Sequence, residues 1–246
     1  MLSNTVLIIV ITVLILYLIY YSEEKITESP KNIMDSGFMY YECNENLENL
    51  NVIQKQNIIK EKVLSNLPAD YVFLDYYYYI KGFSLSTFHR DVTSGQKYLN
   101  TKYPTYTVIL YEYNGDFLSL CPNSHNQFPF IHSKPVNISG KSNTVVIFNS
   151  DILHAGMINN IGINRKVLQF KVAHKDDLDV FKELNNVKLE KTTDCKINRQ
   201  IENILRFLSL HFSWLINGIS YPLMQKKYEN NYIQEIIPIS FYNNIK

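Results

Sequence analysis

Two histidines and an aspartate are spaced so that they could hold a metal ion. His89 and Asp91 follow the short run FSLSTF, and His154 follows another, NTVVIF. Side chains at positions i and i+2 of an extended chain point to the same side, so His89 and Asp91 can reach one ion together. Two imidazoles and one carboxylate on one face of a metal leave the opposite positions open, as in non-haem Fe(II) oxygenases.

Arg165 adds a group of a different kind to this set. It lies 11 positions after His154, at the head of the run RKVLQFKV. Its guanidinium is planar and permanently charged, and it can bind a carboxylate through two parallel hydrogen bonds. Arg165 is therefore a candidate for binding an acidic ligand next to the metal.

The segments that carry these residues are typical of β-strands. Short runs rich in β-branched and aromatic residues lie between Tyr71 and Ala173, separated by Gly, Pro and Asn-Gly. Strands at that spacing, with few helical stretches between them, predict an all-β sandwich or barrel. Such a fold can bring strands that are distant in sequence together around one metal. Before them, apolar residues three and four apart over 47–67 predict an amphipathic helix.

The composition of the N-terminal segment suits a lipid bilayer rather than water. Leu2–Tyr21 contains no charge, Pro or Gly, and about 20 residues match the roughly 30 Å of a bilayer's hydrocarbon core. A cleaved signal peptide would need a charged start and a small-residue cleavage site, and neither is present. We predict a single-pass transmembrane anchor over 1–21, and hence a membrane localisation. Lys25 and Lys31 after the segment favour a cytosolic domain.

Composition excludes several classes of protein. Lys+Arg 24 against Asp+Glu 23 gives a net charge of +1, so no nucleic-acid partner is expected. Tyr 19 and Phe 13 supply core-forming surface and argue against intrinsic disorder. Three widely spaced cysteines indicate neither a disulfide framework nor a metal knuckle.

These patterns divide the chain into four parts. We predict an anchor (1–21), a linker (22–46), a β-domain with its leading helix (47–175) and a C-terminal helical extension (176–246). In the extension, Ile201–Ile219 is a strongly apolar stretch interrupted by Arg206 and His211. We expect this helix to cover the β-core, to form a homodimer or to lie in the membrane interface.

The motifs together resemble the Fe(II)/2-oxoglutarate-dependent dioxygenases, and most of all the phytanoyl-CoA dioxygenase-like branch. The resemblance covers about 71–173 and is carried by FHRD, DFLSLCPNSH, VVIFNSDILHAG and NRKVLQF. It implies a mainly β fold, a double-stranded β-helix of the jelly-roll or cupin type with flanking helices. It also implies that His89, Asp91 and His154 are the catalytic iron ligands.

The resemblance further implies the cofactors and the reaction. These are Fe(II), 2-oxoglutarate as cosubstrate, O₂ and ascorbate as an additional reductant. Arg165 would pair with the distal carboxylate of 2-oxoglutarate, and Thr107 or Tyr111 would complete that site. The expected activity is hydroxylation of an unidentified lipid, small molecule or protein side chain, with release of succinate and CO₂. Ser124 and His125 are expected to shape the pocket.

Other interpretations were weighed against this one. His-Arg-Asp also begins the protein-kinase catalytic loop, but that loop needs Asn where this chain has Gln96. A zinc site could combine Cys121, His125, His132 and His154, although no second closely spaced pair supports it. A metal cupin that does not use 2-oxoglutarate would share the barrel and the histidines. A catalytically inactive β-helix that serves as a membrane-tethered binding module is the non-enzymatic alternative.

Overall fold

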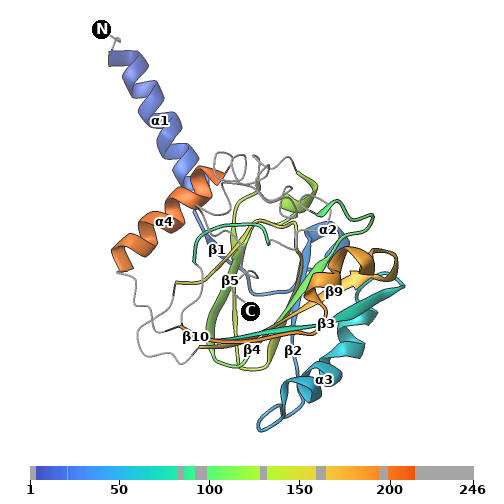
Figure 1. The fold of residues 1–246 in the computed structure, drawn as a ribbon. Helices are drawn as coiled ribbons and strands as arrows, with labels where there is room; N and C mark the ends of the chain where they lie inside the picture. Colours follow the sequence, from blue (N-terminus) through green and yellow to red (C-terminus); the bar gives the residue numbers. More distant parts are fainter. Residues whose placement is uncertain are drawn as a thin grey trace, which may run out of the picture.

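Two β-sheets form the body of the protein in a computed structural model (Figure 1). The structure describes residues 4–20, 22–82, 86–91, 99–127, 132–158, 165–193 and 199–213. The larger sheet has the strand order β10-β3-β9-β4-β7-β2, and the smaller has the order β1-β6-β5-β8. The strands are β1 (Glu24–Lys25), β2 (Phe38–Glu42), β3 (Tyr71–Gly82), β4 (Tyr106–Tyr111), β5 (Gly115–Leu120), β6 (Val136–Gly140), β7 (Thr144–Asn149), β8 (His154–Gly156), β9 (Lys166–His174) and β10 (Val187–Thr193).

The larger sheet is buried on both faces because its central strands alternate between two cores. Every residue of β4 and β7 is buried. Val108 and Leu110 of β4 pack on the outer face, in a cluster with Ile59 and Val63 of helix α3 (Val52–Ser65). The alternate residues of these strands face the smaller sheet and share its core. Side chains from both sheets therefore line the space between them, and every second residue of a strand in the larger sheet points into it.

Helix α3 corresponds to the amphipathic helix predicted over 47–67, but it begins at Val52. Asn51 and Gln54 form a capping box at its start, in which each side chain accepts a hydrogen bond from the other's backbone N–H. The helix ends at Ser65, shortly before Pro68, which disfavours helical backbone in the residue before it.

The segment expected to be a linker contributes structure to both sheets. β1 pairs in parallel with β6, and β2 forms the edge of the larger sheet beside β7. Between them lies the short helix α2 (Ile33–Ser36), which ends at Gly37 with a left-handed φ of 82°. In the expected C-terminal extension, β10 pairs in parallel with β3 at the opposite edge of the larger sheet.

Helix α4 (Arg199–His211) coincides with the first part of the apolar helix expected over 201–219, and residues 214–219 lie outside the described residues. Its buried face includes Arg206, Ser209 and Leu210. Leu210 packs with Phe88 and Leu153, which lie beside two of the candidate metal ligands. The helix therefore covers the β-core at the site.

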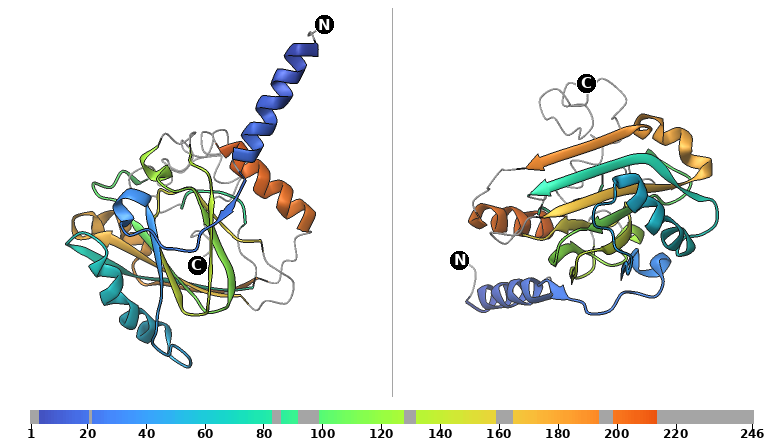
Figure 2. Two further views of the ribbon diagram at one scale, coloured as in Figure 1. Left: turned by 180° about the vertical axis from the view of Figure 1, so that it is seen from behind. Right: turned by 90° about the horizontal axis from the view of Figure 1, so that it is seen from below.

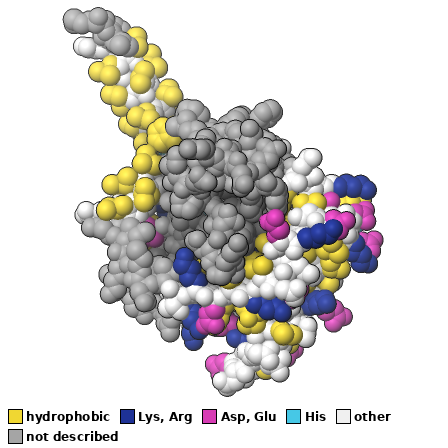
Figure 3. All heavy atoms as spheres, in the orientation of Figure 1, with side chains coloured by type: hydrophobic (Ala, Val, Ile, Leu, Met, Phe, Trp, Pro, Cys, Tyr) yellow, Lys and Arg dark blue, Asp and Glu magenta, His cyan; other side chains and the backbone are white. Residues whose placement is uncertain are grey.

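Helix α1 (Asn4–Tyr20) is apolar on all sides and projects away from the sheets (Figures 1 and 2). Its exposed aliphatic side chains form the apolar column in Figure 3. It has 17 residues, which rise about 26 Å against the roughly 30 Å of a hydrocarbon core. Among the described residues, no helix combines the length and apolarity needed to cross a membrane.

The predicted single-pass transmembrane anchor is therefore wrong. The membrane partner, the membrane localisation and the transmembrane element of the fold all depended on it, and they are wrong with it. The rest of the described chain consists mainly of β-sheets with flanking helices, which is consistent with a cupin-like core.

Candidate metal centre

Backbone hydrogen bonds bring the two histidines together from distant parts of the sequence. The N–H of His89 donates to the carbonyl of His154 at 2.8 Å, and the N–H of His154 donates to the carbonyl of His89 at 2.9 Å. The N–H of Asp91 donates to the carbonyl of Ser150 at 3.3 Å. This antiparallel bridge extends the smaller sheet beyond β8, and it sets the centroids of the two imidazole rings 4.5 Å apart.

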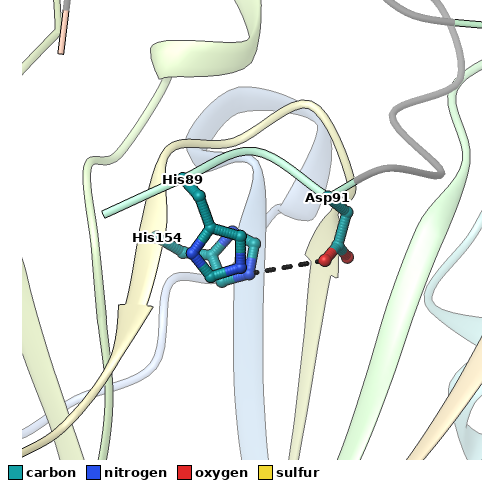
Figure 4. Close-up of side chains that lie close together, drawn as sticks. All are labelled: His89, Asp91 and His154. Atoms are coloured by element: carbon teal, nitrogen blue, oxygen red, sulfur yellow. Dashed lines mark ion pairs between the residues drawn. The ribbon is translucent and has the colours of Figure 1, made fainter. Parts of the chain in front are cut away.

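The three candidate ligands converge, as Figure 4 shows. One potential ligand atom from each of His89, Asp91 and His154 lies within 4.8 Å of the others. Nε2 of His154 is 3.7 Å from Oδ1 of Asp91. Ligand bonds of about 2.0–2.2 Å place neighbouring ligand atoms roughly 3 Å apart. Only a small closure of the cluster around an ion is needed.

Each imidazole is held in the tautomer that metal binding requires. Nδ1 of His89 is 2.8 Å from the carbonyl oxygen of Thr87, and Nδ1 of His154 is 3.0 Å from that of Ile152. A carbonyl oxygen only accepts, so each Nδ1 must carry the proton. In the neutral form of each ring, Nε2 then carries the lone pair that can bind a metal.

The electrostatics of the cluster favour the ligand forms of these groups. Burial, helped by the neighbouring His89, lowers the pKa of His154 to about 4, so its ring is neutral at neutral pH. Burial alone would raise the pKa of Asp91, but the charge and hydrogen bond of Lys171 outweigh burial and hold that pKa well below its usual value. A neutral imidazole and an ionised carboxylate are the forms that bind metals.

The buried lysine that donates a hydrogen bond to Asp91 was not predicted from the sequence. Nζ of Lys171, in β9, donates to Oδ2 of Asp91 at 2.6 Å and to the Thr107 hydroxyl at 2.7 Å. Thr107 donates its own proton to Oδ2 at 2.5 Å, so Ser150 at 2.9 Å donates to Thr107. Side chains alternate between the two faces of a strand, so Lys171 in RKVLQFKV lies on the same face as Arg165. This alternation is the sequence signal that could have identified Lys171.

A buried arginine supports the turn that leads to His154. Arg90 is 3% exposed, and it donates to the backbone carbonyls of Asp151 and Ser124. The Ser124 hydroxyl accepts from the N–H of Leu153 at 2.8 Å. Ser124, which was expected to shape the pocket, thus fixes the backbone beside a candidate ligand. His125 packs close against Gly37 instead.

Arg165 and Tyr111 form a second polar group on the same face of the larger sheet. Both are buried, at 5% and 0% exposure. Nε and Nη1 of Arg165 and the hydroxyl of Tyr111 have no hydrogen-bond partner in the described part of the chain. Burial raises the pKa of Tyr111, against the opposing charge of Arg165. Buried polar atoms are rarely left unpaired, so these atoms point to a missing anionic or polar ligand.

The two hydroxyls expected beside Arg165 lie at different ends of the space between the sheets. Thr107 pairs in register with Lys171, whereas Tyr111 pairs with Val167, two residues from Arg165. Thr107 and Tyr111 are four residues apart, roughly 13 Å along a strand. Thr107 is thus at the metal-ligand end, and Tyr111 is at the Arg165 end.

The zinc alternative does not gather its ligands. Sγ of Cys121 is 3.6 Å from Nδ1 of His132, but Nε2 of His132 faces the carbonyl oxygen of Leu210 at 3.1 Å. Within the described residues, His89, Asp91 and His154 are the only three metal-ligating side chains that cluster.

Among known proteins, this chain is similar at low identity to solved structures. No protein-family model matches the sequence, and no curated protein is significantly similar to it. Solved structures that resemble part of this chain include EvdMO1 (13% identity, TM-score 0.40, 56% of this chain and 35% of that chain). They also include SnoK, a non-haem alpha-ketoglutarate-dependent carbocyclase from nogalamycin biosynthesis (13%, 0.36, 57% and 80%). A third is NvfI, an iron and alpha-ketoglutarate-dependent endoperoxidase (10%, 0.38, 61% and 92%).

Two of these three proteins belong to the chemical class that the sequence motifs resemble, and none of the three is described as a phytanoyl-CoA dioxygenase. The chain spans about a third of the length of EvdMO1. Identities and TM-scores this low establish neither family nor activity.

Proposed function

We propose that this protein is a non-haem Fe(II)/2-oxoglutarate-dependent oxygenase in which His89, Asp91 and His154 bind the iron. One observation carries the proposal: two imidazoles with protonated Nδ1 and free Nε2 converge with an ionised carboxylate. Structural zinc sites usually complete a tetrahedron from protein ligands. A cluster of two histidines and one carboxylate leaves the remaining positions for small ligands, as oxygen-activating iron requires.

Arg165 and Tyr111 support 2-oxoglutarate as the cosubstrate. Their unpaired polar atoms lie on the inter-sheet face that also carries Lys171 and Thr107 beside Asp91. A guanidinium and a phenol together can hold one carboxylate through charge-assisted hydrogen bonds. A metal cupin that does not use 2-oxoglutarate would leave these atoms without a purpose.

Bound Fe(II) and 2-oxoglutarate would supply O₂-dependent oxidation, in which a substrate C–H bond becomes C–OH and 2-oxoglutarate becomes succinate and CO₂. The chain itself would supply the three ligands, of which His154 is buried and His89 and Asp91 are half-buried, together with a carboxylate-binding pair. The substrate class and the use of ascorbate stay predictions from the motifs.

An anaerobic binding experiment tests the proposal. Fe(II) and 2-oxoglutarate added to the full chain should produce a visible metal-to-ligand charge-transfer band. His89→Ala and His154→Ala should each abolish this band. His174→Gln is the matched control, because that ring stacks on Tyr103 in another part of the molecule, and it should retain the band.

The outcomes separate the alternatives. Folded wild-type protein that binds Fe(II) without any band on adding 2-oxoglutarate would favour a metal cupin. Folded wild-type protein that binds no Fe(II) would overturn the proposal and favour a non-catalytic binding module.

A further inference from the structure

Lys171 is an unusual residue to find in the middle of a buried strand. Its side chain is 1% exposed, and its ammonium group donates to Asp91 and Thr107. An ammonium group is unfavourable inside a protein unless it is paired, and here its pair is a proposed iron ligand. Iron binding by Asp91 as proposed above does not in itself require this lysine.

The hydrogen bonds distinguish the two oxygens of Asp91. Oδ2 accepts from Nζ of Lys171 at 2.6 Å and from the Thr107 hydroxyl at 2.5 Å. Oδ1 is the oxygen that faces Nε2 of His154, at 3.7 Å. Two donors therefore engage the oxygen that is turned away from the histidines, and the other oxygen is available to a metal.

This division matters because a carboxylate can bind a metal through one or both oxygens. Bidentate binding by Asp91, added to two histidines, would fill four positions of an octahedral ion. A chelating 2-oxo acid would fill the other two, and no position would be left for O₂. Ligation through Oδ1 alone keeps one position open.

Lys171 also changes the net charge of the protein groups around the metal site. Two neutral imidazoles and one carboxylate carry a charge of −1, and the adjacent ammonium cancels it. A divalent ion is then poorly neutralised by the protein, until a dianionic chelator adds its own charge. Metal binding and chelator binding should consequently reinforce one another.

We infer that Lys171, with Thr107, is a positioning residue that restricts Asp91 to metal binding through Oδ1 and makes metal affinity depend on the anionic cosubstrate. The inference rests on the proposed function and deepens it. Because the two binding events reinforce one another, we expect the metal and the chelator to bind as a pair rather than singly.

The test compares Mn(II) binding by the full chain with and without 2-oxoglutarate, using the EPR signal of free Mn(II). Lys171→Met should tighten Mn(II) binding in the absence of 2-oxoglutarate by at least about tenfold, because a nearby positive charge is removed. It should also reduce the enhancement that 2-oxoglutarate gives. Lys175→Met, which removes an exposed lysine that lies four residues further along the chain and is paired with Asp70, should match wild type.

Lys171→Gln provides a second variant in case Lys171→Met does not fold, as judged by circular dichroism. It keeps a donor for Oδ2 without the charge, and it should also tighten Mn(II) binding. A purely structural role for Lys171 predicts weaker binding in both variants. Unchanged or weaker binding by a folded variant, with normal binding by wild type, would overturn this inference alone. A wild-type protein that binds no Mn(II), with or without 2-oxoglutarate, would overturn the proposed function as well.

Discussion

Replacing Arg206 by Met should remove the contact that fastens α4 and the N-terminal segment to the metal-ligand strands. The guanidinium donates to both carboxylate oxygens of Glu23, at 2.6 and 3.0 Å, and to the Ser119 hydroxyl. It also donates to the backbone carbonyls of Ser86 at 2.8 Å and Gly156 at 2.7 Å. Ser86 precedes His89 by three residues, and Gly156 follows His154 by two, so this one side chain ties both ligand segments together.

The size of the effect follows from burial. The side chain of Arg206 is 7% exposed and that of Glu23 is 24% exposed. Removing one partner of a buried ion pair costs about 3–5 kcal/mol, because the other charge is left unpaired. Glu23 can recover some hydration, which places the expected loss near the lower end, at about 3 kcal/mol. For a chain of this length that loss lowers Tm by roughly 6–12 °C.

Urea and thermal unfolding of the full chain, followed by circular dichroism, measure this loss. Arg199→Met is the matched control, since Arg199 lies in the same helix with an exposed side chain. It should change the free energy of unfolding by less than about 0.5 kcal/mol. A loss below about 1 kcal/mol for Arg206→Met would refute the reasoning, because a solvent-screened surface pair gives that value.

Three further predictions concern Arg165, Tyr111 and Glu23. Arg165→Met should weaken 2-oxoglutarate binding about 10- to 100-fold in an anaerobic titration of the charge-transfer band, while Mn(II) affinity without 2-oxoglutarate changes little. Tyr111→Phe should raise the free energy of unfolding of the ligand-free protein by about 1 kcal/mol, since it removes an unpaired buried hydroxyl, and it should also weaken 2-oxoglutarate binding; a loss of stability would contradict this. Burial raises the pKa of Glu23, but the hydrogen bond and charge of Arg206 outweigh burial and lower it below the ordinary 4.5. The stabilisation by Glu23 is thus fully present above 4.5 and lost as pH falls through the lowered value, so urea unfolding should separate Glu23→Gln from wild type at about pH 7, and the difference should shrink as pH falls below 4.5.

The candidate ligands could be located from the sequence because their spacing follows strand geometry. The side chains of His89 and Asp91 share a side of an extended segment, and His154 ends a buried hydrophobic run, so two local patterns were enough to name them. Arg165 was recognisable from its place at the head of the next run. Lys171 was missed because a lysine in an apolar strand looks like an edge or surface residue until its partner is known.

Two features of the structure could not be predicted from local sequence patterns. β1 consists of only two charged residues, Glu24 and Lys25, and β1 and β2 pair with strands more than a hundred residues away, β6 and β7. Strand formation of this kind depends on partners rather than on local propensity. The predicted membrane anchor depended on the apolar composition of residues 2–21, whereas the described helix within them has 17 residues.

The most direct test of the central claim is anomalous diffraction from crystals of the full chain loaded anaerobically with Mn(II) and 2-oxoglutarate. The account predicts one strong anomalous peak bonded to Nε2 of His89, Nε2 of His154 and Oδ1 of Asp91, with 2-oxoglutarate chelating the same ion and reaching Arg165. A peak at other side chains, or a folded and loaded crystal with no peak between these three residues, would contradict it.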